Sequence, residues 1–494
     1  MKILLIHPPW MRFFGSTLIA PPVALNYLAV YIQKHLPEHE IEIYNADFAP
    51  DQVPTLSNYL FTEKHEQYVR RLTDPQDPIW AEIERVIAEY RPDVVGISSM
   101  TASYISAVMV SRIAKKVNSS IITIMGGKHP TALPAETAAN ESVDFVVIGE
   151  GEETLRELLE NVQNPDAIRG IAFKDRAGAV RITEPRPYIR DINTLPLPIF
   201  ESSLQKYSFQ NTDNPAIYTW IMVSARGCPF QCLYCASDKI VRFRSPESVG
   251  DEVRQVKQKY GITRFCFEDD SFSLNKERLL KLCAVLKTEN VTWICNTRVD
   301  LLDESIVSAM KQAGCVGVAI GIETGSEKTL IAISKKITLA RVREAISLLR
   351  RHHLLVTGYF MVGFPWETHA EMKKTINLMR TIPLDLFYLS IVTPLPGTPL
   401  FQSLRDSGKI VLPNLDWKRF HQGSPFMNFS DTMGDAEWEK TIREMVGHAF
   451  RMHRKKYFFA TLRKFCQEPG AVFRKIRDRL AKGPAMLRKL IFPN

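Results

Sequence analysis

Apolar residues in the first 165 positions fall into short runs that alternate with helical patterns. The runs have the length of buried parallel strands: Ile3–Ile6, Ile41–Tyr44, Val94–Ile97, Ile121–Met125 and Phe145–Ile148. Helical spacing of apolar residues is found in the segments between them: Val23–Gln33, Trp80–Tyr90, Ser106–Val117 and Glu153–Val162. This alternation predicts an α/β fold with a doubly wound parallel sheet, whose ligands bind beyond the carboxyl ends of the strands.

A second alternating series begins near Thr219. Its strand candidates are Trp220–Ser224, Arg264–Phe267, Thr292–Asn296, Val316–Ile320, Thr357–Val362 and Leu386–Val392. Its helix candidates are Val249–Lys259, Lys276–Leu286, Glu304–Gln312, Leu339–Arg351 and His369–Thr381. About six βα units predict a partial (β/α)6 barrel of the TIM type, with its chemistry at the strand C-termini.

Four segments follow from these patterns. Residues 1–165 form the first sheet domain, and residues 219–400 form the barrel. Residues 166–218 read as a connector with a small hairpin (Gly170–Lys174 and Val180–Thr183) and a proline-bearing run. Residues 401–494 read as a cap with an α-helical C-terminal tail, in which two helices are expected near 451–465 and 472–489.

The positive charge of the chain is concentrated in this tail. Residues 451–494 carry 13 Lys and Arg against two Asp and Glu, a net of +11, whereas the whole chain is +9 and residues 1–450 therefore sum to −2. A nucleic-acid-binding face spread over the folded domains is therefore not supported. We expect neither a signal peptide nor a transmembrane helix, and we expect a cytoplasmic protein.

Three of the eight cysteines lie within eight positions: Cys228, Cys232 and Cys235. Their C-x3-C-x2-C spacing, in a loop after a predicted strand, is typical of thiolates that hold an iron–sulfur cluster. Three ligands to a four-iron cube leave one iron open to bind a substrate. The other five cysteines are expected in the core.

A structural zinc knuckle is the alternative interpretation of the three cysteines. It needs a fourth Cys or His nearby, and the first one that follows is Cys266, in a predicted strand.

At these residues the sequence resembles the radical S-adenosylmethionine (SAM) superfamily. The resemblance implies that Cys228, Cys232 and Cys235 hold a 4Fe–4S cluster whose open iron binds SAM and cleaves it to a 5′-deoxyadenosyl radical. By the same resemblance, Tyr234 packs near the adenine. Further SAM contacts are implied at strand ends: Glu268, Asp269, Arg298 and Glu323.

The N-terminal half resembles the cobalamin-binding domain that is fused to one class of these enzymes. Its opening run Ile6–Trp10, its serine loop and its double-glycine loop carry the resemblance, which implies cobalamin contacts at Ser99, Thr101, Gly126, Gly127 and His129. The Asp-x-His-x-x-Gly motif is absent, so the lower cobalt ligand is unassigned, and His7 and His129 are candidates by location. A sheet domain that no longer binds cobalamin is the alternative.

Together the two resemblances imply C-methylation of an unactivated carbon. SAM supplies the radical, methylcobalamin supplies the methyl group, and a protein such as flavodoxin or ferredoxin supplies electrons. The layout also resembles the anaerobic magnesium-protoporphyrin ester cyclase, so cyclisation or oxidation is the alternative reaction. A methylthiotransferase is disfavoured because no cysteine precedes Cys228. A non-catalytic cobalamin or SAM sensor is disfavoured because such a binder needs no cluster.

The substrate is the least determined point. The tail mixes basic with apolar residues, which suits either peripheral membrane contact or ordinary packed helices. Membrane contact favours a lipophilic substrate, either a tetrapyrrole of (bacterio)chlorophyll biosynthesis or an isoprenoid lipid of the hopanoid kind. The layout favours the tetrapyrrole, and a nucleic-acid partner for the tail is the less favoured option.

Overall fold

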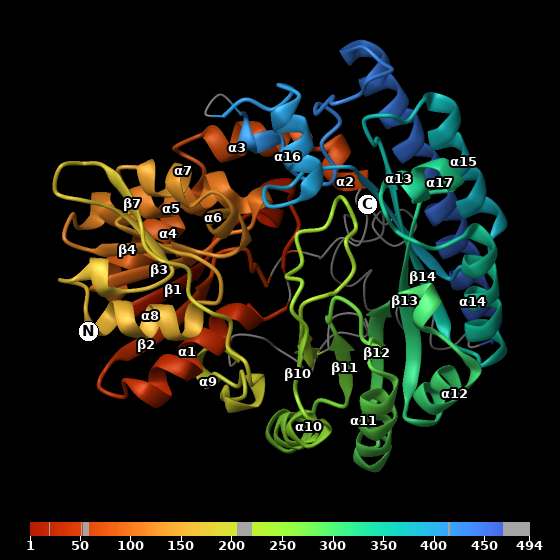
Figure 1. Cartoon of the computed structure of the whole chain (residues 1–494), viewed down its shortest axis with the longest axis horizontal. Helices are drawn as coiled ribbons and strands as arrows, with labels where there is room; N and C mark the ends of the chain where they lie inside the picture. The colour runs from red at the N-terminus through yellow and green to blue at the C-terminus, as the bar shows by residue number, and fades with distance from the viewer. Residues whose placement is uncertain (19, 51, 53–58, 205–219, 413–414, 468–494) are drawn as a thin grey trace.

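The computed structural model describes residues 1–467 apart from 19, 51, 53–58, 205–219 and 413–414, with side chains described as far as Arg454. The predicted helix near 472–489 lies outside the described residues. Two α/β units stand side by side, with the C-terminal segments packed along the second unit and across the top of the first (Figure 1).

Five parallel strands form the first unit in the order β2-β1-β3-β4-β5. They are β1 (Lys2–His7), β2 (Glu40–Asn45), β3 (Val94–Ser98), β4 (Ile122–Gly126) and β5 (Phe145–Val147). Along β1, Leu4 and Ile6 enter one apolar cluster and Ile3 and Leu5 the other. Both faces of the sheet are therefore buried, as the continuous apolar runs predicted.

The hairpin predicted in the connector extends this same sheet. β6 (Ile171–Lys174) pairs antiparallel with β5, and β7 (Val180–Ile182) pairs antiparallel with β6.

Helices cover both faces of the first sheet. The four predicted ones are α1 (Val23–His35), α4 (Pro78–Tyr90), α5 (Tyr104–Val117) and α8 (Gly151–Glu160). Four short helices were not predicted: α2 (Tyr59–Glu63), α3 (His65–Thr73), α6 (Lys128–Ala132) and α7 (Pro134–Ala139).

Six parallel strands form the second unit in the order β8-β11-β12-β13-β14-β15. They are β8 (Trp220–Met222), β11 (Arg264–Phe267), β12 (Thr292–Thr297), β13 (Cys315–Glu323), β14 (Leu355–Val362) and β15 (Leu386–Ile391). Within the described residues, β8 and β15 are the two edges of this sheet. The predicted partial barrel is thus confirmed as an open one.

The outer side of the barrel is covered by helices that begin at side-chain caps. They are α10 (Pro246–Tyr260), α11 (Lys276–Glu289), α12 (Glu304–Gln312), α14 (Leu339–Arg351) and α15 (His369–Thr381) (Figure 1). Asn275, Asp303 and Thr338 each accept a hydrogen bond from a backbone N–H in the first turn, at 2.9, 2.9 and 3.1 Å. Such caps are worth about 1 kcal/mol each and fix where a helix begins.

Residues 416–426, the cap segment, connect the two units. Its Trp417 packs edge-on against His129 at a centroid distance of 4.7 Å, and its His421 Nε2 lies 2.9 Å from Nδ1 of His65. The long helix α17 (Asp435–Gln467) follows and packs against α15 and β15. No helix in the described part of the chain is both long enough and apolar enough to cross a bilayer.

Candidate active site

The cysteine loop connects β9 (Ala225–Arg226) to β10 (Arg242–Phe243), two short antiparallel strands. Its entry depends on Gly227, whose φ of +90° and whose close approach to the Ile240 carbonyl oxygen leave no space for a side chain. Two backbone hydrogen bonds fix the loop, from Cys228 N to Asp238 O (2.8 Å) and from Leu233 N to Ile333 O (3.0 Å). One hydrogen bond within the loop and one to the backbone of Ile333 therefore fix its conformation.

The three cysteine thiols of this loop suit a cationic cluster. Cys228 and Cys232 are buried, Cys235 is half-buried, and none is in a disulfide. Burial raises the pKa of the Cys228 thiol, and Asp270 and the other two cysteines raise it further. Adjacent thiolates in such a place need positive charge, and the iron of a cluster supplies it. In the described residues, no three His, Cys, Asp or Glu side chains converge on one point as a single ion would need. A cube does not need this convergence, because each thiolate ligates a different iron.

Arg298 lies directly against the cysteine loop. Its guanidinium is 3.8 Å from Cys232 Sγ and stacks over the Phe230 ring at 3.7 Å. Two hydrogen bonds to Asp300, at 3.0 and 3.1 Å, fix the plane of the guanidinium. The predicted SAM contact is therefore positioned beside the cluster ligands, where its charge also stabilises thiolate.

A buried ion pair lies next to the predicted adenine residue Tyr234. Glu323 Oε1 accepts a hydrogen bond from Lys335 Nζ at 2.6 Å, both side chains are less than a tenth exposed, and Lys335 Nζ is 3.4 Å from the Tyr234 hydroxyl. Burial raises the pKa of Tyr234 well above its usual value, and Glu323 adds to the rise. Sequence reasoning placed Tyr234 and Glu323 here but missed Lys335.

The backbone around this pair is held in the left-handed region. Glu323, Ser334 and Lys336 have φ of +70°, +55° and +56°. Non-glycine residues in this region cost about 1 kcal/mol or more each and cluster at functional sites. These left-handed residues around Lys335 mark a candidate functional site in the structure. Nothing in the sequence pattern indicated them.

Asp269 and Glu268, predicted together as SAM contacts, occupy different environments. Asp269 is fully buried, and its carboxylate accepts hydrogen bonds from Ser224 N (2.6 Å) and Ala225 N (3.0 Å), directly before the cysteine loop. Burial raises the pKa of Asp269 to about 6. Glu268 is exposed on the inner face of the barrel, where its carboxylate meets Asn296 Nδ2 at 3.1 Å. The Asp269 side chain thus holds the cysteine loop, and Glu268 faces the open barrel.

A buried carboxylate fixes the loop that follows β14. Glu367 accepts hydrogen bonds from the backbone N–H of Gly363 (2.9 Å) and Phe364 (3.2 Å). Burial raises the pKa of Glu367 to about 7, against the lowering effect of these two hydrogen bonds. The folded protein therefore keeps a proton on Glu367 at pH values where the unfolded chain loses it.

This proton gives a testable pH dependence. Because the folded pKa is raised above the ordinary value of 4.5, the contribution of Glu367 to stability is greatest below about pH 4.5, and roughly 2–4 kcal/mol of it is lost as the pH rises through 7. Glu367→Gln removes the titration, so its melting temperature changes less between pH 5 and pH 8 than that of the native protein. Glu371→Gln is the control, because the pKa of Glu371 is lowered and its contribution has the opposite sign. Identical pH profiles for native protein and Glu367→Gln would refute this role.

The predicted cobalamin loops meet at one edge of the first sheet. The strand order reverses between β1 and β3, and a ligand crevice lies outside such a reversal point. Ser99 N donates to Gly126 O at 2.7 Å, and His129 N donates to Ser99 O at 3.4 Å, so the serine and double-glycine loops are in contact. This edge has the small residues and the backbone groups that a nucleotide tail can approach.

Gly127 is the tightest point of this edge. Its φ is +108°, and a Cβ there would lie 2.4 Å from Ser99 O. We expect Gly127→Ala to lower the melting temperature and to abolish retention of cobalamin, read from corrin absorbance after desalting. Gly178→Ala is the matched control, because Gly178 has a φ of +82° but open space around it. It bears the same type of strain, about 1–3 kcal/mol, and should retain corrin. Equal corrin content in both variants would contradict the assignment.

The two histidine candidates for the lower cobalt ligand differ in access. His129 is fully buried, stacks on Tyr104 at 3.8 Å, and has Nδ1 3.3 Å from Thr101 Oγ1. Burial lowers the pKa of His129 to about 3. His7, at the end of β1, is partly buried; burial lowers its pKa, and the nearby Asp47 opposes this. The assignment of the lower cobalt ligand stays a prediction.

Ion pairs join the cobalamin edge to the cysteine loop. Glu150, in the loop after β5, accepts hydrogen bonds from Arg226 and Arg242, each at 2.6 Å, and Glu152 accepts one from Arg226 at 2.6 Å. Burial raises the pKa of Glu150, but the hydrogen bonds from Arg242 and Arg226 outweigh this and lower it. Lys128, beside Gly127, pairs with Asp238 at 3.2 Å. These ion pairs therefore hold the predicted cobalamin edge against the cysteine loop.

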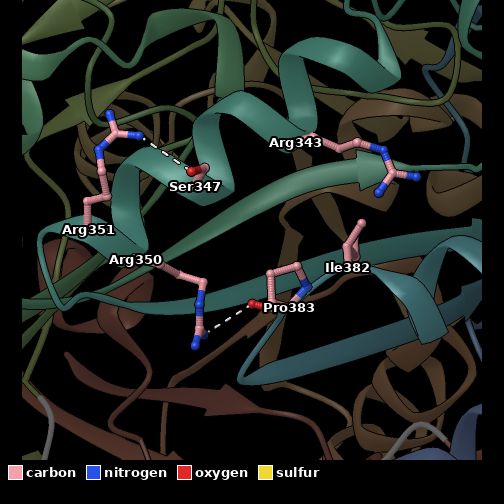
Figure 2. Close-up of a pocket in the computed structure, with 6 residues that line it drawn as sticks. All are labelled: Arg343, Ser347, Arg350, Arg351, Ile382 and Pro383. Carbon is pink, nitrogen blue, oxygen red and sulfur yellow. Dashed lines mark hydrogen bonds between the residues drawn. The ribbon is translucent and has the colours of Figure 1, made fainter.

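A separate groove of about 450 Å³ lies on the outer face of α14 (Figure 2). Its lining is Arg343, Ser347, Arg350, Arg351, Ile382 and Pro383. Arg350 donates to the Pro383 carbonyl at 3.2 Å and Arg351 to Ser347 Oγ at 3.4 Å. Because the groove is in the helix layer, the barrel sheet separates it from the inner face, and it takes no part in the cofactor site.

The barrel and the first sheet each match a family model. The Radical SAM superfamily matches residues 222–379, and the B12 binding domain matches residues 16–159. These matches and the donor set described above give the cofactors of the chain as a 4Fe–4S cluster, SAM and cobalamin.

Similar proteins cover from two thirds to nearly the whole of the chain. An uncharacterized methyltransferase of Pyrococcus horikoshii is 30% identical over 86% of this chain and 88% of its own length. The anaerobic magnesium-protoporphyrin IX monomethyl ester cyclase of Rubrivivax gelatinosus is 26% identical over 94% of this chain and 82% of its own length. The bacteriochlorophyllide d C-12(1)-methyltransferase of Chlorobaculum tepidum is 25% identical over 66% of this chain and 68% of its own length.

The fold is shared with a solved structure. The radical SAM methyltransferase TsrM of Kitasatospora setae, with cobalamin and a 4Fe–4S cluster bound, has a TM-score of 0.63 at 17% identity and covers 89% of this chain and 84% of that one. Sequence and fold together show that this chain belongs to the cobalamin-dependent radical SAM family of methyltransferases and related enzymes.

Proposed function

We propose that the chain transfers a methyl group to an unactivated carbon of a tetrapyrrole of the bacteriochlorophyll type. When bound, the cluster and SAM supply a 5′-deoxyadenosyl radical, and cobalamin supplies the methyl group. The observation that carries the proposal is the pairing of Glu150 with Arg226 and of Lys128 with Asp238, because it fastens the cobalamin edge to the cysteine loop. A radical source and a methyl source held at one site suit methylation. The tetrapyrrole is supported by the similarity to the bacteriochlorophyllide methyltransferase.

The chain's own residues position the reactants in this proposal. Arg298 and the Lys335–Glu323 pair bind and orient SAM, Tyr234 packs on its adenine, and the Gly127 loop holds the cobalamin tail. A low-potential protein such as flavodoxin or ferredoxin delivers the electron. The basic residues of α17 and beyond provide for peripheral contact with an anionic membrane, where such substrates concentrate.

Labelled SAM tests the proposal. Protein reconstituted without oxygen with iron, sulfide and cobalamin is incubated with reductant, methyl-deuterated SAM and bacteriochlorophyllide d. Mass spectrometry should show the intact labelled methyl group in the product, and 5′-deoxyadenosine should form in step with it. SAM cleavage with no labelled product from this tetrapyrrole would reject the proposed substrate.

Cyclisation is the second candidate, favoured by the similarity to the Rubrivivax cyclase over 94% of this chain. The same assay with magnesium-protoporphyrin IX monomethyl ester separates the two reactions. A cyclase forms a new ring without incorporating the label, whereas a methyltransferase incorporates it.

A further inference from the structure

Alternate residues of β11–β15 point to the inner side of the open barrel, away from the helix layer. The strand register aligns them in rows across the sheet: Asn296 lies opposite Ala319 and Ala319 opposite Thr357, while Gly321 lies opposite Tyr359. Several of these side chains are large, apolar and well exposed: Ile294 (39%), Tyr359 (40%), Leu386 (43%) and Leu355 (57%). Apolar exposure of this kind inside an enzyme barrel marks a binding surface.

The middle of this inner face is a floor of small residues. On β13, Gly317, Ala319 and Gly321 occupy successive inward positions. A Cβ on Gly321 would lie 2.4 Å from Glu323 Oε1 and 2.7 Å from Lys335 Nζ. The floor therefore reaches directly to the ion pair at the predicted SAM site, so a molecule lying on it is within reach of the radical.

One side of the floor is aromatic. Tyr359 and Tyr388 are opposite each other on β14 and β15, and their rings stack with centroids 5.7 Å apart and planes at 28°. Burial raises the pKa of Tyr359, and the charge of Glu268 adds to the rise. Two stacked rings beside the small-residue floor provide a surface on which a flat conjugated molecule can pack.

The other side of the floor is polar. Glu268 accepts hydrogen bonds from Cys266 Sγ and Asn296 Nδ2, each at 3.1 Å. Cys266 was expected in the core, but it is half-buried on this inner face. An exposed carboxylate held by two donors still has acceptor capacity for a hydrogen bond from a ligand.

We infer that this inner face is the substrate bed, and that it selects a flat conjugated ring carrying a hydrogen-bond donor at its edge. The ring seats on the small-residue floor against Tyr359 and Tyr388, and the donor meets Glu268. This inference rests on the proposed function and adds the residues that determine specificity. A flexible isoprenoid makes no use of the stacked rings or the carboxylate.

Binding measured without turnover tests the bed. Protein loaded with cluster, cobalamin and SAM, but without reductant, is titrated with hematoporphyrin dimethyl ester and, separately, with farnesol. This porphyrin carries two hydroxyl donors at its edge and no free carboxylate. Tyr388→Leu and Tyr359→Leu keep apolar bulk but remove a ring, and each should weaken porphyrin binding about five- to tenfold. Glu268→Gln should weaken it as well, because an amide accepts the donor less strongly. Leu280→Ala, exposed on the outer face of α11, is the control and should bind as the native protein does.

Three results would overturn the inference. One is unchanged affinity for the porphyrin in both tyrosine variants, provided that their iron content and melting temperature are native. The second is farnesol binding more tightly than the porphyrin, with losses in the same variants. The third is that the native protein does not bind the porphyrin at all. Label transfer to bacteriochlorophyllide d, measured on the same preparations, reports separately on the proposed function. Methylation with unaffected binding in the variants rejects the bed alone, and ring-dependent binding without methylation supports the bed and rejects the reaction.

Discussion

Cys232→Ala is expected to eliminate both the cluster and SAM cleavage. The substitution removes one of the three thiolates that hold the cube. Cys232 is buried and lies beside Arg298. Iron content should fall from about four per chain towards zero after anaerobic reconstitution, and 5′-deoxyadenosine should drop below detection.

Cys283→Ala is the matched control for this loss. Cys283 is also a buried cysteine, but it belongs to helix α11, in the helix layer. It should cost about 1 kcal/mol of stability and leave iron content and SAM cleavage intact. Retention of four irons by Cys232→Ala, or equal losses in the two variants, would show that this loop does not hold the cluster.

Lys335→Met is expected to have two effects: weaker SAM binding and a less stable fold. Removing one partner of a buried ion pair leaves Glu323 uncompensated, at a cost of about 3–5 kcal/mol. SAM affinity, measured by equilibrium dialysis on the cluster-loaded protein, should fall at least about tenfold.

A double variant separates the two effects. Lys335→Met with Glu323→Met removes both charges, so most of the stability should return while SAM affinity stays low. If SAM affinity returned together with the melting temperature, the pair would be purely structural.

The strands were predictable because their signal is local. Strand β11 (Arg264–Phe267) and the helices of 304–312, 339–351 and 369–381 begin and end where the apolar pattern predicts. β13 is longer than its predicted run, since Gly321 and Glu323 continue the strand into the site. The helix α3 was not predicted, because its buried positions include His65 and Tyr68 and so lack an aliphatic stripe.

The parts that sequence reasoning missed depend on contacts between distant segments. Lys335 stands in a Ser-Lys-Lys loop that is typical of a solvated surface, and only the fold brings it to Glu323. His129 was placed at the cobalamin edge, but the ring that encloses it is Trp417, almost 300 positions later. Cys266 was expected in the core because strand parity does not tell which face of a barrel strand is open. Cysteine spacing was informative because all three predicted ligands lie in one loop.

The carboxylate of Glu150 has a consequence for how the holoenzyme assembles. It forms ion pairs with Arg226, two residues before the first cysteine, and with Arg242, on the strand that follows the same loop. A shift of this carboxylate when one cofactor region fills therefore reaches the other region. By thermodynamic linkage any such effect is reciprocal: whatever factor corrin adds to the affinity for the cluster, the cluster adds to the affinity for corrin. We expect the loading of the two cofactors to be coupled, and iron and corrin titrations of the half-loaded protein measure the factor.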